Sequence, residues 1–211
     1  FFPSPRLRLY GTNLELEESI LKVEGAEIDI ILNPLSLINY KKLNYNKILI
    51  TGGLTNVKVS KINKLLDYLK KNKKKINFKK NTIIILKEKK KLFEINTSTI
   101  KINSKNNIRL LDISGLLSNY KISFLLENKL ENKSNITLKI PELDILANVS
   151  LQSKDNFKTL EGLISFAVLN NLFQFNFVKE KNITIKKGYV RNNLINSSFE
   201  GKVFFKPHFF F

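Results

Sequence analysis

The sequence contains no cysteine and a single histidine, and this scarcity removes several kinds of site. Without cysteine the stretch can form neither a disulfide nor a thiolate metal site. The one histidine, His208, stands between Pro207 and Phe209, and we expect it to be a strand or sheet-edge residue. A Ser-His-Asp triad and a metal site built from several histidines are therefore excluded for this sequence.

Long apolar runs and phosphate-binding glycine motifs are missing as well. No apolar stretch approaches the roughly 18–20 residues that cross a bilayer as a helix. Neither GxGxxG nor the P-loop pattern GxxxxGK occurs. Neighbouring carboxylates do occur, at Glu17 and Glu18 and at Glu142 and Asp144, but no partner base accompanies them. We predict that the chain is not an enzyme and that it uses no cofactor and no metal ion.

Positive charge is abundant, but almost all of it is lysine. Lys and Arg number 36 against 18 Asp and Glu, a net charge of +18, and the only arginines are Arg6, Arg8, Arg109 and Arg191. Asn, Ile and Lys are enriched together, while Trp and Met are absent. This joint skew is as typical of a genome-wide compositional drift as of a selected basic surface. We therefore give the net charge little weight as functional evidence.

The densest basic stretch is KKNKKKINFKK, residues 70–80. It holds one aromatic residue, Phe78, and no arginine, whereas nucleic-acid surfaces usually interleave both. We therefore expect no nucleic-acid partner. A solvated helix end and loop is the simplest explanation of the run. Contact of Lys73, Lys74 and Lys75 with lipid headgroups is the functional alternative.

Residues 26–59 show the pattern that organises the chain. Apolar side chains take every second position in three runs, which are Ile28, Ile30 and Leu32, then Ile48 and Ile50, then Val57 and Val59. Such period-two alternation is typical of half-buried β-strands. Gly52-Gly53, between the second and third runs, indicates a turn.

The period changes after residue 59. Ile62, Leu65, Leu66 and Leu69 follow the spacing i, i+3, i+4, i+7, and Ser60 is placed to cap the N-terminus. The last turn is rich in lysine, which suits the negative end of a helix dipole. The pattern predicts one short helix over residues 60–71.

Beyond residue 80, short alternating segments are separated by clusters of Asn, Lys, Ser and Gly, as in a strand meander. Residues 159–173, TLEGLISFAVLNNLF, fit either a helix or a strand, and Gly162 favours a strand. We predict a mainly β fold, an extended and curved antiparallel sheet with an apolar groove, in one region that covers residues 1–211. Alternation by itself does not distinguish an open groove from a closed sandwich whose apolar faces bury each other.

If the groove is open, the residues that line it share an inward position on an alternating strand. These candidates are Ile28, Ile30, Leu32, Ile48, Ile50, Val57, Val59, Ile100, Ile102, Phe124, Leu126, Leu138, Ile140, Phe173, Phe175 and Phe177. For the phenylalanine-rich strands the alternative is ordinary core packing.

Four stretches of the sequence carry a family resemblance. The opening has Pro3-Ser4-Pro5 followed by Arg6 and Leu7. The next two stretches have apolar and turn residues at Ala26, Ile28, Ile30, Leu32, Pro34, Leu35 and Leu37, and at Ile48, Ile50, Gly53, Leu54, Val57 and Val59; the predicted helix follows. With this series the first seventy residues resemble the AsmA family of Gram-negative envelope proteins. The family's proline before the last of these strands is replaced by Gly-Leu-Thr, and its Asp-Gly-x-x-Asn-Trp lead-in to the helix is missing.

The resemblance implies a protein tethered in the inner membrane by a helix upstream of Phe1, with its body on the periplasmic side, so that the sequence is part of a longer chain. The family is related to bridge-like lipid-transfer proteins. Its likeness implies a role in outer-membrane biogenesis, with phospholipid acyl chains held in a β-groove for transport between the inner and outer membranes. The alternative is a non-enzymatic assembly factor, or scaffold, for outer-membrane proteins that acts through exposed strand edges.

Overall fold

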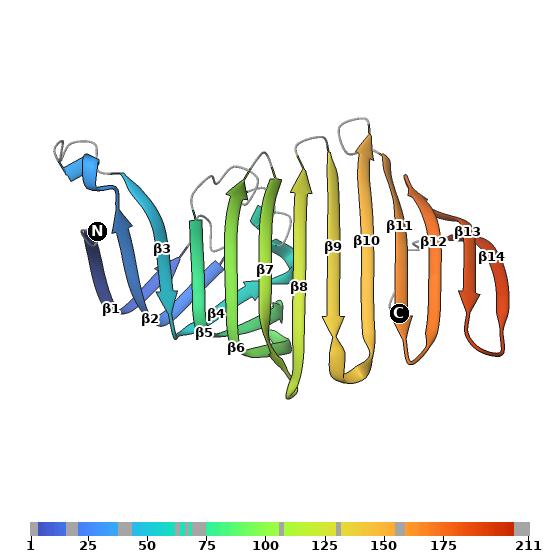
Figure 1. The fold of residues 1–211 in the computed structure, drawn as a ribbon, viewed down its shortest axis with the longest axis horizontal. Coiled ribbons are helices and arrows are strands. Elements are labelled where there is room, and N and C mark those ends of the chain that lie inside the picture. Colours follow the sequence, from blue (N-terminus) through green and yellow to red (C-terminus); the bar gives the residue numbers. More distant parts are fainter. Residues whose placement is uncertain are drawn as a thin grey trace, which may run out of the picture. The chain divides into compact units, whose positions relative to one another are not determined.

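A computed structural model describes residues 4–15, 21–37, 44–61, 64, 65, 68, 75–105, 108–129, 132–154 and 159–204. The fold is mainly β, with 80% strand and 7% helix, and the prediction of a mainly β chain is confirmed. Fourteen strands are hydrogen-bonded into one mixed sheet (Figure 1). The chain divides into two compact units, Phe1–Ser123 and Phe124–Phe211.

The first unit contains strands β1 to β7 and the start of β8. The strand order is β1-β2-β3-β5-β6-β7, and β4 pairs with β2 and β5. The bounds are β1 Arg6–Glu15, β2 Leu21–Leu32, β3 Tyr45–Thr51, β4 Leu54–Lys58, β5 Lys75–Lys87, β6 Lys90–Lys105, β7 Ile108–Leu117 and β8 Tyr120–Lys129, with short 3-10 helices η2 Pro34–Leu37 and η4 Val59–Lys61.

Strands β3 and β4 form one interrupted strand between β2 and β5. Both pair antiparallel with β2 and parallel with β5. The sheet is therefore mixed, whereas the sequence predicted antiparallel pairing throughout. The difference arises because the connection from β4 to β5 is a crossover and not a hairpin, so β5 runs in the same direction as β3 and β4.

The crossover contains part of the predicted helix. Lys64, Leu65 and Tyr68 are helical, after the 3-10 helix η4. Leu65 and Tyr68 pack against the buried core of the first unit. Ser60 and Lys61 lie in η4, and the remaining predicted helix positions, Ile62, Leu66 and Leu69 among them, lie outside the described residues.

Gly52 and Gly53 interrupt a strand and do not make the turn that the sequence predicted. Their φ angles are +68° and +80°, a left-handed conformation that glycine adopts without steric cost. A Cβ on Gly53 would lie 2.6 Å from the backbone oxygen of Glu24. The break is held from β5, because Asn81 Nδ2 donates to the carbonyl oxygens of Gly52 and Gly53 at 2.8 and 3.0 Å.

Neighbouring strands bend at the same level as this break. Positive φ angles occur at Gly11 in β1, Gly25 in β2, Lys80 in β5 and Thr97 in β6. Shifts of strand register accompany them in the β1–β2, β5–β6 and β6–β7 pairs. Such bulges sharpen the local bend and twist of a strand.

The apolar side chains of the first unit are buried in one cluster, which contains residues from both sides of the bend. Its members are between 0% and 7% exposed: Leu21, Val23, Ala26, Ile28, Ile50, Val57, Ile76, Phe78, Ile83, Ile95, Ile100 and Ile102. Phe78 is the largest fully buried side chain of the described residues. The alternating pattern of residues 26–59 therefore marks the core of this unit.

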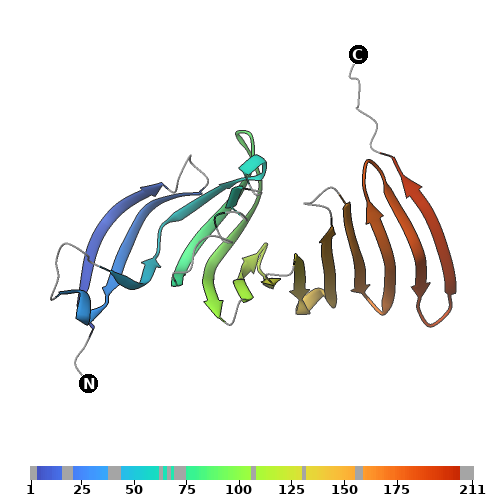
Figure 2. The same cartoon turned by 90° about the horizontal axis from the view of Figure 1, so that it is seen from above.

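The second unit is an antiparallel meander in chain order. Its strands are β9 Lys133–Ile140, β10 Ile145–Lys154, β11 Thr159–Val168, β12 Asn171–Lys179, β13 Ile183–Arg191 and β14 Asn196–Val203, with the 3-10 helix η5 Pro141–Leu143. Strand β11 confirms that residues 159–168 are a strand and not a helix. Figures 1 and 2 show these six strands side by side in a single layer.

Candidate functional site

One face of the six-stranded meander is predominantly apolar, and we call it the apolar face. Residues directly opposite each other on paired strands share a face of the sheet, so the strand registers define its members. The apolar members are Ile136, Leu138, Ile140, Ile145, Ala147, Val149, Leu151, Leu160, Ile164, Phe166, Val168, Phe173, Phe175, Phe177, Ile183, Ile185, Val190, Phe199 and Val203. The same registers also place five polar residues on it, Ser134, Ser153, Asn171, Lys179 and Ser197.

The opposite face, the polar face, is mostly hydrophilic. Strand β10 shows the contrast most clearly, because from Ile145 to Gln152 its odd-numbered apolar residues are half-buried and its even-numbered residues are exposed. Thr137 and Asn148 are hydrogen-bonded on the polar face, as are Gln174 and Tyr189. The sheet is therefore amphipathic across its thickness.

The side chains of the apolar face cover one another, and little else in the described part of the chain covers them. Of its apolar members only Ile140 and Phe177 are less than a tenth exposed, at 9% and 7%, and nearly all the others are half-buried. The core of the first unit, at 0–7%, is much more completely covered. Within the described residues of the second unit, no second sheet or long helix packs on this face (Figure 2).

Phenylalanine rings cover much of the middle of the apolar face. The ring centroids of Phe166 and Phe173 are 6.4 Å apart, and those of Phe175 and Phe199 are 6.0 Å apart with an edge-to-face geometry. Two glycines give the rings room. A Cβ on Gly162 would lie 2.8 Å from the ring of Phe177, and one on Gly188 would lie 2.6 Å from the ring of Phe199. Both rings therefore pack closely against a glycine of the neighbouring strand.

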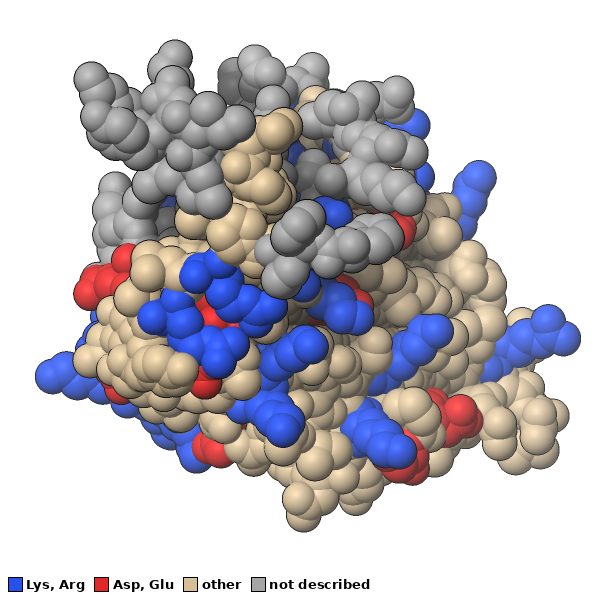
Figure 3. Space-filling model, turned by 60° about the vertical axis from the view of Figure 1, so that its left-hand side comes forward, with Lys and Arg blue, Asp and Glu red and all other residues tan. Residues whose placement is uncertain are grey.

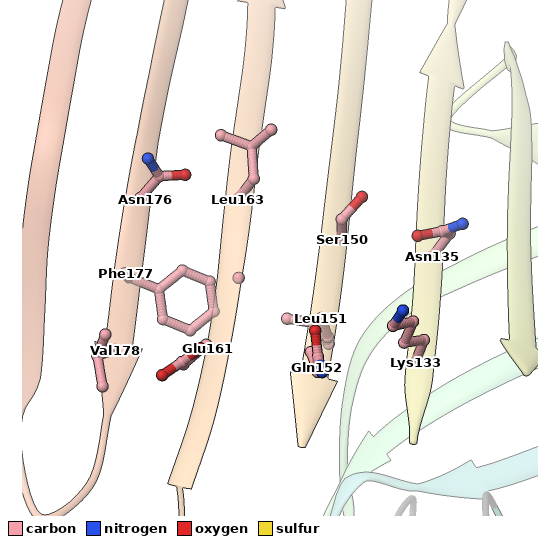
Figure 4. Close-up of a pocket in the computed structure, with 11 residues that line it drawn as sticks. Lys133, Asn135, Ser150, Leu151, Gln152, Glu161, Leu163, Asn176, Phe177 and Val178 are labelled. Atoms are coloured by element: carbon pink, nitrogen blue, oxygen red, sulfur yellow. The ribbon is translucent and has the colours of Figure 1, made fainter. Parts of the chain in front are cut away.

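The polar side of the same sheet carries a shallow hollow of about 450 Å³ (Figure 4). Most of its lining comes from the polar face: Lys133, Asn135, Ser150, Gln152, Glu161, Leu163, Asn176 and Val178, with Leu151, Gly162 and Phe177 as the remainder. Glu161 is the only acidic residue of the lining, and its carboxylate lies 2.8 Å from Lys154 Nζ. The acidic residue of this lining is therefore ion-paired with a lysine of the neighbouring strand.

The candidate groove residues divide between the two units. Ile28, Ile50, Val57, Ile100 and Ile102 lie in the buried cluster of the first unit, and Ile30 and Ile48 pack against it. Leu32 is half-buried at the end of β2, and Val59 is 39% exposed in η4.

In the second unit, Leu138, Ile140, Phe173, Phe175 and Phe177 lie together on the apolar face. Phe124 is half-buried and Leu126 is buried, both on β8. Sequence reasoning missed most of the face, including Val149, Ile164 and Phe166. Their alternation is visible in the sequence, but the strand registers were needed to align them.

Of the three headgroup candidates, only Lys75 is described; Lys73 and Lys74 lie outside the described residues, as does His208. Lys75 is exposed at the start of β5, opposite Lys47 of β3. Lys47 is in turn opposite Ile31, which is opposite Arg6. Three cations thus stand in one row across the sheet, and Figure 3 shows lysine and arginine side chains with acidic ones among them on this side of the molecule.

Next to this row an acid is held between arginines. Arg8 Nε and Nη2 donate to the two carboxylate oxygens of Asp29 at 2.7 and 3.1 Å, and Arg6 lies 3.7 Å away. The hydrogen bond from Arg8 lowers the pKa of Asp29, and burial of the carboxylate, which acts in the opposite direction, does not cancel it. The pair is a structural link between β1 and β2.

Because of this ion pair, we expect part of the free energy of unfolding to be lost when the pH is lowered. The folded-state pKa of Asp29 lies below its ordinary value of 3.8. The stabilisation that the Asp29–Arg8 pair gives the folded state is therefore fully present above pH 3.8, and it is lost as the pH falls through the lower folded-state pKa. Urea unfolding between pH 7 and pH 3 should show a steeper loss for the wild type than for Asp29→Asn. Parallel curves for the two proteins would contradict this assignment.

Among the described residues, no group of three or more His, Asp or Glu side chains is arranged to hold a metal ion. No helix in the described part of the chain has the length and apolar character needed to cross a membrane. Comparison of the chain with known protein families, curated proteins and solved structures found no match.

Proposed function

We propose that this chain is a non-enzymatic, AsmA-like protein of cell-envelope biogenesis that holds phospholipid acyl chains on its apolar face. The observation that carries the proposal is the half-exposed apolar face of β9 to β14. The resemblance of residues 1–70 to the AsmA family supports the same function and a location on the periplasmic side of the inner membrane.

The dimensions of the face suit an acyl chain. Six strands about 4.8 Å apart span about 24 Å, and strands of eight to ten residues are about 26–33 Å long, so the sheet has a footprint of about 600–800 Å². One leaflet of a bilayer is about 15 Å of hydrocarbon, half of the roughly 30 Å core. An acyl chain therefore fits along or across the strands.

The binding energy would come from burial of methylene groups and not from any specific contact. Each CH₂ contributes about 0.8 kcal/mol, so six buried groups give about 5 kcal/mol. Because neighbouring positions on the face differ little in character, a chain could move between them against small barriers. Lys73, Lys74 and Lys75, which belong to the first unit, remain the candidates for contact with lipid headgroups.

Native mass spectrometry of the purified protein, followed by lipid extraction, tests the proposal. We expect phospholipid to co-purify and to be displaced by added detergent. A lipid-free protein that also takes up no phospholipid from vesicles would overturn the proposal.

A matched pair of substitutions on β10 separates lipid holding from folding. Val149 lies on the apolar face and Ser150, its neighbour, is exposed on the polar face. Val149→Asp should reduce bound lipid at least about tenfold, because a carboxylate would contact the acyl chain, whereas Ser150→Asp should leave it unchanged. Thermal unfolding of lipid-stripped samples is the control. If Val149→Asp destabilised the stripped protein but bound lipid normally, Val149 would be a packing residue only.

The free edge of β14 favours a second candidate function. Among the described strands β14 pairs only with β13, and β1 only with β2. An extended segment of an unfolded outer-membrane protein could add to such an edge through backbone hydrogen bonds. A crosslink from β14 to an unfolded barrel protein, together with an absence of bound lipid, would favour this assembly role.

A further inference from the structure

Two turns at one end of the second unit expose large apolar side chains. Leu169, between β11 and β12, is 69% exposed, and Leu194 and Ile195, between β13 and β14, are 94% and 54% exposed. The strand registers place both turns at the same end, because Val168 pairs with Asn171 and Arg191 pairs with both Leu172 and Asn196. This is the lower end of the second unit in Figure 1.

Hydrogen bonds hold these side chains outward. Asn192 Oδ1 accepts from the backbone N–H groups of Leu194 and Ile195 at 2.8 and 2.6 Å. Asn192 Nδ2 donates to Asn171 Oδ1 at 2.9 Å and so ties the two turns together. Leu169 and Asn170, with φ +46° and +64°, form the two-residue hairpin turn between β11 and β12, and this turn holds the Leu169 side chain at the end of the sheet.

The turn at the opposite end of the same strands is charged. Lys179, Glu180 and Lys181 occupy the connection from β12 to β13, and all three are exposed. Val203 and Phe204 are also exposed at that end, at 44% and 61%, next to residues outside the described range. Among the described turns, the one from β12 to β13 is therefore charged, whereas those from β11 to β12 and from β13 to β14 carry exposed aliphatic side chains.

We propose that this end of the second unit docks on a lipid bilayer by inserting Leu169, Leu194 and Ile195 into the acyl boundary. Three protruding side chains cannot supply the roughly 1,000 Å² of complementary surface that a stable protein interface needs. A fluid apolar layer requires no matching pocket, and an apolar surface can enter it to a depth of about 5–10 Å. The neighbouring turn carries Glu142 and Asp144, so we expect insertion to need no anionic lipid.

The docking goes beyond the holding of lipid on the apolar face and can occur without it. It would bring the end of that face, at Val168 and Ile145, against the bilayer. Acyl chains could then pass between the membrane and the face without crossing water.

The absence of tryptophan from the chain allows a direct test. Leu194→Trp places one fluorophore on an apolar tip, and Lys181→Trp places one on the charged turn as the control. With phosphatidylcholine vesicles at high salt, the first variant should shift its emission to the blue and be quenched by brominated acyl chains, and the control should do neither. An unshifted Leu194→Trp spectrum, or equal shifts in both variants, would overturn the proposal.

A variant that should lose membrane binding provides a second test of the docking proposal. The triple substitution Leu169→Ser, Leu194→Ser and Ile195→Ser should weaken co-sedimentation with the same vesicles at least about tenfold, since each buried leucine is worth a factor of this size. Lys179→Ser with Lys181→Ser is the control and should bind like the wild type. The triple variant should keep its melting temperature and its co-purified lipid, which distinguishes failure of docking from failure of the proposed function. Unchanged vesicle binding by the triple variant would refute insertion.

Discussion

Replacing Phe78 by alanine is expected to lower the free energy of unfolding by about 3–5 kcal/mol, the usual cost of removing a buried phenylalanine. Phe78 is 1% exposed on β5 and lies opposite Ile50 of β3 and Ile100 of β6. Its removal would leave a cavity between three strands of the bent sheet. The partial helix of the crossover, through Leu65, packs against the same cluster, so we expect the loss to spread through the first unit.

Phe93→Ala is the matched control, because Phe93 is 44% exposed on the neighbouring strand β6. It should cost less than about 1 kcal/mol, because an exposed site lacks the mechanisms that cause large losses. Urea unfolding, followed by circular dichroism, measures both. Similar losses for Phe78→Ala and Phe93→Ala would contradict a close-packed core in the first unit and would favour an open groove there as well.

Replacing Gly162 by alanine should destabilise the second unit by about 3 kcal/mol, at the upper end of the usual overpacking cost. An added Cβ would lie 2.4 Å from the backbone oxygen of Ser150 and 2.8 Å from the ring of Phe177. The ring could turn away, but the backbone oxygen belongs to the neighbouring strand β10 and can move only with it. The β10–β11 ladder would therefore have to separate locally.

Gly201→Ala is the control for the same chemical change. No atom lies within 4 Å of a Cβ at Gly201, and its φ is not in the left-handed region. We expect a change within about 0.5 kcal/mol, as for most surface substitutions. Thermal unfolding of the two variants should differ clearly. If Gly162→Ala were neutral, the backbone of β10 would not lie as close to this glycine as described, and the central part of the β10–β11 pair would differ from the description above.

The same substitution also bears on function. If Phe177 is displaced from the apolar face, the lipid held by Gly162→Ala should decrease, while that held by Gly201→Ala should not. Lipid extraction after purification provides the measurement. This outcome depends on the proposed function, whereas the loss of stability does not.

The strand pattern was predictable because alternation is a local property of the chain. Residues such as Ile28 and Val149 alternate with polar neighbours, and this alternation means that one side of each predicted strand avoids water. In the ambiguous segment 159–173, the surroundings correctly indicated a strand for residues 159–168, but the turn at residues 169 and 170 was not predicted. Gly52-Gly53 was misread, because the same glycine pair serves a hairpin turn or a break within a strand, and only the partners on either side decide between them.

The sequence by itself determined that the chain is mainly β, that it has no thiol chemistry and that its strands each have an apolar side. The tertiary structure alone decided which of those sides are buried. In the first unit, matched bulges bend the strands, and the apolar residues on both sides of the bend meet in one core. In the second unit, the strands from Lys133 to Val203 pair in unbroken chain order, and their apolar sides remain half-exposed on one face. The difference depends on strand register and on aligned bulges, which are relations between distant residues that local periodicity does not encode.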